Sequence, residues 1–197
     1  MKKLLLLTAI AAASLLPSAA KADVVLLVDL SVANQVTVIA TPGLSAVTRT
    51  GSTATGFYLQ NFFNSLTTGA VTSAGVGNIS TFLQAPDLSP LAFRNTSTDP
   101  GFNIFSYSAV GTTGVTAGIQ AFQGSATFTL SPAAYGLALT ALGASVDRNV
   151  FFPADRLSNM SAGAIVGTWQ VVPEPSTVAF CLVGAGGLLV ARLRRKK

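Results

Sequence analysis

Side chains suited to catalysis are sparse in this 197-residue chain. It contains no histidine, which excludes a Ser-His-Asp triad and a His-ligated zinc site within the chain. Its single cysteine, Cys181, lies in an apolar segment, where it suits a small helix residue better than an extracellular nucleophile. We therefore expect no enzyme activity, no catalytic residue, no metal and no cofactor.

Two aspartate–arginine pairs allow more than one interpretation. Asp147-Arg148 and Asp155-Arg156 bracket Phe151-Phe152-Pro153, so they could form a polar site beside an aromatic platform. We favour loop ion pairs or turn caps, because exposed pairs of this kind are common and weak. Two carboxylates could also serve a glycosidase, but their spacing in sequence does not set their distance in space.

Four aromatic residues could stack on sugar rings: Trp169, Tyr58, Tyr107 and Tyr135. Trp169 alternates with apolar residues, and Tyr135 lies on the apolar face of a predicted helix. Both patterns favour core packing over sugar binding for these two residues.

The most distinctive motif is Pro173-Glu174-Pro175, flanked by Val172 and Ser176. Each proline fixes φ and removes a backbone donor, and each disfavours helix in the residue before it. The motif should therefore present its carboxylate on an extended, accessible backbone, as the cleft of a processing enzyme requires.

An apolar run and a basic cluster follow this motif. Thr177 to Ala191 would form a helix about 22 Å long at about 1.5 Å per residue, which is short for a hydrocarbon core of about 30 Å. We predict a marginal transmembrane helix over about 177–191, suited to a signal held briefly in the membrane. The basic tail 192–197 should stay cytoplasmic and anchor it. Its charged residues are Arg192, Arg194, Arg195, Lys196 and Lys197.

The N-terminal residues 1–22 have the pattern of a secretory signal peptide. Lys2-Lys3 is a short positive region, and Leu4 to Leu16 is an apolar core. Ala20 and Ala22 supply the small residues that signal peptidase requires, which places cleavage before Asp23.

Residues 173–197 resemble the PEP-CTERM sorting domain of Gram-negative bacteria. The ordered triplet of Pro-Glu-Pro, short apolar helix and arginine-rich tail carries the resemblance. It implies recognition by an exosortase, a membrane transpeptidase-like protease, and delivery to the cell surface or extracellular polymer. Extracellular polysaccharide is then a candidate partner.

The region between these signals, residues 23–172, is weakly charged. It contains four basic and six acidic residues and so has a net charge of −2, because most basic residues of the chain lie at its ends. Nucleic-acid binding needs clustered Lys and Arg, so we expect none. Abundant Ser, Thr, Gly and Ala predict a hydroxyl-rich surface.

The same region should be mainly β. Short alternating or apolar runs separated by turn residues predict an antiparallel β-sandwich or jelly-roll-like ectodomain. The predicted strands lie within 24–30, 36–40, 57–60, 102–107, 126–130 and 165–171.

One short helix is predicted from its end signals. Ser131 can cap it, Pro132 fits its first position, and Gly143 can close it. Tyr135, Leu139 and Leu142 would share its apolar face. We expect the helix to pack across an edge or end of a sheet.

Together these features predict an exported protein that is membrane-anchored at least transiently and then reaches the cell surface or the extracellular space. The leading hypothesis is a surface or extracellular-matrix-associated structural protein, sorted and processed by an exosortase-like enzyme. An extracellular carbohydrate-binding module is the alternative, and a carboxylate-dependent glycosidase is a third candidate.

Overall fold

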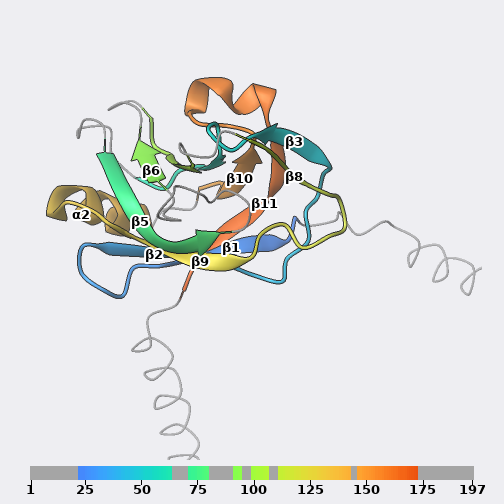
Figure 1. The fold of residues 1–197 in the computed structure, drawn as a ribbon. Helices are drawn as coiled ribbons and strands as arrows, with labels where there is room; N and C mark the ends of the chain where they lie inside the picture. The colour runs from blue at the N-terminus through green and yellow to red at the C-terminus, as the bar shows by residue number, and fades with distance from the viewer. Residues whose placement is uncertain are drawn as a thin grey trace, which may run out of the picture.

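The computed structural model describes residues 22–63, 71–79, 91–94, 99–106, 111–142 and 146–172. These residues are mainly β, as predicted (Figure 1). The strands of the main sheet are β1 (Val24–Asp29), β2 (Gln35–Ala40), β4 (Phe57–Leu59), β5 (Val71–Ile79), β6 (Leu91–Arg94), β7 (Phe102–Phe105), β9 (Gly124–Thr129), β10 (Asn149–Phe152) and β11 (Ala164–Val171). The other elements are the ribbon strands β3 (Arg49–Ser52) and β8 (Thr112–Val115), the helix α2 (Pro132–Ala141) and the 3-10 helix η2 (Leu157–Ala162).

The main sheet closes on itself into a barrel in the order β1-β11-β10-β4-β7-β6-β5-β9-β2. The predicted sandwich or jelly roll is therefore wrong in its architecture. Alternation along a strand shows that one face is buried, but it is the same for two packed sheets and for one closed sheet. Closure comes from β1, which pairs with both β2 and β11.

The prediction of antiparallel pairing is also wrong at one place, because β1 runs parallel to β11. Strand number explains this departure. A closed ring in which all neighbours are antiparallel needs an even number of strands, whereas the described residues form nine. One parallel pairing resolves the mismatch, and it joins the first strand to the last.

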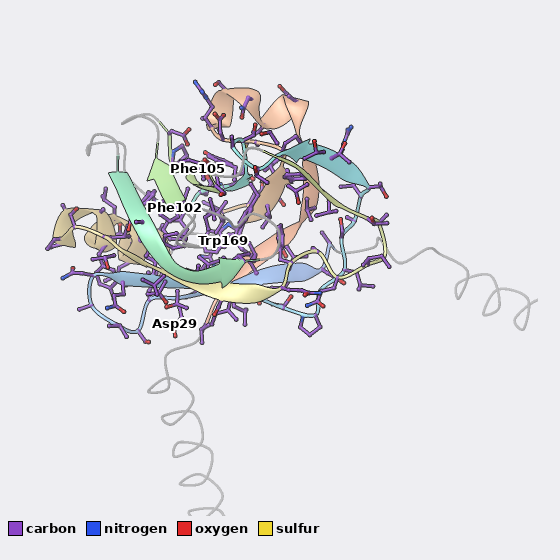
Figure 2. The ribbon with its side chains drawn as sticks, viewed as in Figure 1. Asp29, Phe102, Phe105 and Trp169 are labelled. Carbon is purple, nitrogen blue, oxygen red and sulfur yellow. The ribbon has the colours of Figure 1, made fainter. Side chains whose placement is uncertain are left out.

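Aromatic side chains fill the barrel interior. Phe62 stacks on Phe102 with 4.8 Å between ring centroids, and Phe62 lies 5.6 Å from Trp169. Phe128 meets Phe102 edge-to-face at 6.0 Å. All four side chains are buried, and Figure 2 shows Phe102 and Trp169 within the barrel. Aromatic pairs at such distances stabilise a core beyond the area that they bury.

The small-residue tract from Gly69 to Gly77 has a composition typical of a loop or a loosely specified edge strand. Instead, its described part belongs to β5, which pairs with β6 and β9 inside the closed sheet. Gly75 explains part of this difference, because a Cβ atom there would lie 2.5 Å from Cε1 of Phe128. The glycine leaves room for an aromatic ring.

The alternation predicted for β11 fails at one residue. Val150 pairs with Gly167 and Phe151 pairs with Ile165, so Val166 is an extra residue in a β-bulge. The bulge turns Val166 into the core and leaves Ile165 exposed, although simple alternation would put Ile165 on the buried face with Trp169.

The predicted helix is present as α2. Ser131 is its N-cap, and its hydroxyl accepts a hydrogen bond from the Ala134 backbone N–H at 3.2 Å. The helix ends at Ala141, while Gly143 lies outside the described residues. Its buried residues are Ala134, Ala138 and Ala141.

The predicted apolar face of α2 is therefore only partly correct. Tyr135 and Leu142 pack against the core, but Leu139 is exposed. Alanines recurring at i, i+4 and i+7 let the helix backbone approach the barrel closely, so the larger leucine stays outside.

Candidate functional site

The N-terminal boundary of the barrel is fixed by hydrogen bonds to Asp23. The backbone N–H of Thr168 donates to the Asp23 carbonyl at 2.8 Å, and the backbone N–H of Leu44 donates to Asp23 Oδ2 at 2.9 Å. Asp23 thus contributes to the fold directly after the predicted cleavage position. Ala22 is half-buried, and Ala20 lies outside the described residues.

We expect the mature protein to begin at Asp23, because cleavage there removes the leader without removing a residue that the barrel uses. N-terminal sequencing of protein recovered from cells tests this. Ala20→Leu should leave the precursor intact, because a bulky side chain does not fit the small-residue pocket of signal peptidase. A mature pool that retains Met1 would contradict the prediction.

The C-terminal boundary is equally well defined. The backbone N–H of Val172 donates to the Val28 carbonyl at 2.9 Å, one residue before Pro173. Trp169 holds the end of β11 in place: its indole N–H donates to the Gln60 carbonyl at 3.0 Å. The predicted motif therefore begins directly after a strand whose end is held by hydrogen bonds.

The two boundaries lie at opposite ends of the barrel. Because β1 and β11 are parallel, Val24 is opposite Thr168, whereas Val28 is opposite Val171. Asp23 thus precedes β1 at one end, and Val172 leaves β11 at the other (Figure 1). A six-residue strand spans about 20 Å.

The Asp155-Arg156 pair fits the interpretation as a loop ion pair. Asp155 and Arg156 form an exposed ion pair at 3.0 Å. The hydrogen bond from Arg156 lowers the pKa of the Asp155 carboxyl, against the opposing effect of partial burial.

Arg148 does something different: it donates to the Leu142 carbonyl at 3.0 Å, at the end of α2. Its guanidinium also lies 5.1 Å from the Trp169 ring centroid. Both contacts stabilise the departing end of β11, because a cation suits a helix C-terminus and the face of an indole ring.

Asp99 has a structural role that its place in the sequence did not reveal. It is buried, and its Oδ1 accepts hydrogen bonds from the Tyr58 hydroxyl and the Gly101 backbone N–H. Its Oδ2 accepts from the Leu157 backbone N–H at 3.0 Å, which ties η2 to the barrel. The turn composition of Asp99-Pro100-Gly101 was the only signal, and it does not identify Tyr58 as a partner.

The aromatic residues that could stack on sugars are placed mainly in the core. Trp169 and Tyr58 are buried, and Tyr135 is partly buried and donates its hydroxyl to the Leu30 carbonyl. Core packing is thus confirmed for Trp169 and Tyr135, whereas Tyr107 lies outside the described residues. Across the part of the chain that is described, no three His, Cys, Asp or Glu side chains form a group that could hold a metal ion.

Comparison with known proteins assigns the C-terminal segment. The model of the PEP-CTERM protein-sorting motif matches residues 171–196. The chain carries a PEP-CTERM sorting domain. No curated protein and no solved structure matches it.

The PEP-CTERM domain marks an exported protein that an exosortase-type membrane enzyme recognises. The motif indicates that the protein is exported, processed at the membrane and then delivered to the cell surface. The match begins at Val171, so the sorting domain overlaps the last residue of β11 and continues through Val172.

The individual sorting residues stay predictions. Pro173, Glu174 and Pro175, like the basic residues from Arg192 to Lys197, lie outside the described residues. So does the transmembrane helix predicted over 177–191. Among the described residues, no helix has the length and apolar character needed to cross a membrane.

Proposed function

We propose that this PEP-CTERM protein is a non-catalytic structural component of the cell surface or extracellular matrix, delivered there by an exosortase-like enzyme. The observation that carries the proposal is the position of the sorting domain, which begins where a tightly packed barrel ends. In such a protein the barrel is the stable folded domain, and the sorting signal directs it to the cell surface.

The surface chemistry supports this role. The region 23–172 has few charges and many hydroxyl side chains, which form hydrogen bonds with a hydrated polymer without strong ionic attraction. On the barrel wall, the hydroxyls of Thr37 and Thr127 pair across neighbouring strands at 2.8 Å. This cross-strand pairing stabilises the sheet and does not resemble a reactive site.

The aromatic and carboxylate side chains give the alternatives less support. Sugar-binding platforms need accessible ring faces, but Trp169 and Tyr58 are buried. Glycosidases need two carboxylates that face a substrate. Asp99 instead directs both carboxylate oxygens to donors within the protein.

The proposal is tested with processed protein purified from the cell surface or the culture medium. We expect it to accompany the extracellular polymer fraction, to hydrolyse no glycan and to show no selective binding on a glycan array. Saturable binding to a subset of glycans would favour the carbohydrate-binding module instead, and hydrolysis would favour the glycosidase.

A further inference from the structure

Three exposed apolar side chains occur in segments near the departing end of β11. They are Val32, Leu139 and Val146, whose exposed fractions are 55%, 37% and 42%. The acidic residues Asp29 and Asp147 occur in the same segments. We call these five residues the exit patch.

The topology brings these segments together. β1 ends beside Val171 and continues into the turn that contains Val32, while β10 begins antiparallel to the end of β11. The backbone N–H of Trp169 donates to the Arg148 carbonyl at 2.8 Å, which places the segment with Val146 and Asp147 at the same end. Figure 2 shows Asp29 where β11 leaves the barrel.

The helix α2 crosses this end of the barrel. The Tyr135 hydroxyl donates to the Leu30 carbonyl beside the turn, and Arg148 bonds the carbonyl of Leu142 at the other end of the helix. Leu139 follows Tyr135 by one helical turn, on the same stripe. Its exposed side chain therefore lies on the side of α2 that carries the turn contact.

The chain beyond Val172 limits how far any enzyme on the sorting motif can be from the patch. Only Pro173 to Ser176 separate Val172 from the apolar run that begins at Thr177. Four residues span at most about 14 Å when fully extended. An enzyme that binds the motif must therefore lie close to this end of the barrel.

The charges of the exit patch favour a protein surface over a lipid bilayer as its binding partner. Asp29 and Asp147 make its surroundings acidic, while the guanidinium of the neighbouring Arg148 is directed to the end of α2 and to Trp169. An acidic surface is repelled by anionic lipid headgroups. It suits a protein surface with an apolar centre and basic groups at its rim.

We infer that the exit patch is a second recognition surface for the exosortase-type enzyme, which reads the folded barrel together with the motif. This inference rests on the proposed sorting of the chain by that enzyme. Contact at the patch raises the local concentration of the motif at the catalytic cleft, so the barrel contributes to the rate of processing.

The test uses the full chain in cells that contain the processing enzyme. Val32→Glu/Leu139→Glu should slow conversion of precursor to processed protein about five- to tenfold in a pulse-chase experiment, because a carboxylate at the apolar centre of the contact would lose its water without gaining a partner. Leu44→Glu is the matched control. The Leu44 side chain is 46% exposed, and its backbone N–H donates to Asp23 at the opposite end of the barrel. It should be processed at the wild-type rate. Protease resistance of the barrel confirms that all variants are folded.

A linker variant separates docking from an indirect effect on the motif. With about twelve Gly and Ser residues inserted after Val172, the barrel is no longer held against the enzyme. Chains with and without the two glutamates should then be processed at the same rate. Equal rates for wild type and Val32→Glu/Leu139→Glu without the linker would overturn the inference, as would equal slowing by Leu44→Glu.

Two further arms identify the source of any failure. If Glu174→Ala is processed normally in the same experiment, the sorting proposal itself fails. If it is blocked while the patch variant is processed normally, only the exit-patch inference fails. Cosedimentation of the purified processed protein with phosphatidylglycerol vesicles, lost in the patch variant, would identify a bilayer as the occupant and also overturn the inference.

Discussion

Glu174→Ala is expected to leave an unprocessed precursor in the inner-membrane fraction, with its C-terminal tail attached. The substitution removes the only carboxylate of the Pro-Glu-Pro motif. Replacing Pro173 and Pro175 with alanine should have the same result, because helix could then extend upstream and hide the motif. We expect loss of processed protein to be nearly complete in both cases, measured by immunoblotting of fractionated cells that carry an exosortase.

A matched control is Ser176→Ala, which changes a neighbour of the motif without altering its carboxylate or its prolines. It should be processed like wild type. Deletion of 192–197 should have a different result: without basic residues the helix predicted over 177–191 should slip through the membrane, and uncleaved protein should be released. Normal processing and localisation of both motif variants would show that Pro173 to Pro175 is merely a linker.

Trp169→Ala should strongly destabilise the barrel, lowering the free energy of unfolding by about 3–5 kcal/mol. It removes the ring that contacts Phe62, the indole hydrogen bond to the Gln60 carbonyl and the surface on which Arg148 packs. A loss of this size is a large fraction of the stability of a single domain, which is about 5–15 kcal/mol. The midpoint of denaturation should therefore move to a clearly lower urea concentration.

Urea denaturation of the processed protein, followed by far-UV circular dichroism, measures this effect. Fluorescence is unsuitable because Trp169 is the only tryptophan. Tyr135→Phe is the control: it removes one hydroxyl bonded to the Leu30 carbonyl and should cost only about 1 kcal/mol. If Trp169→Ala cost no more than this control, the indole would not be the centre of the core.

Individual strands and the helix were predictable where the residue pattern and the residues at the ends of the element indicate the same structure. In β2, Val36 and Val38 alternate with polar or less buried neighbours, and both are buried. The start of α2 follows from Ser131 and Pro132, which supply a cap and a favourable first position. The sorting domain was recognisable because its signals are contiguous in the chain.

Closure of the barrel was not predictable, because it depends on pairing between distant segments. No local property of Val24 specifies Thr168 as its neighbour. The role of Asp99 was hidden for the same reason, since its partner Tyr58 belongs to another strand. The exit patch combines three separate segments, so only the fold reveals it.

The pairing of β1 with β11 also sets an order of events during export. The barrel cannot close until Ala164–Val171 has crossed the membrane, because the last strand is a neighbour of the first. Contacts between such distant residues are slow to form. The chain should thus remain open during most of its translocation. The sorting domain follows directly after β11. We therefore expect the barrel to close at nearly the same time as the sorting domain reaches the membrane.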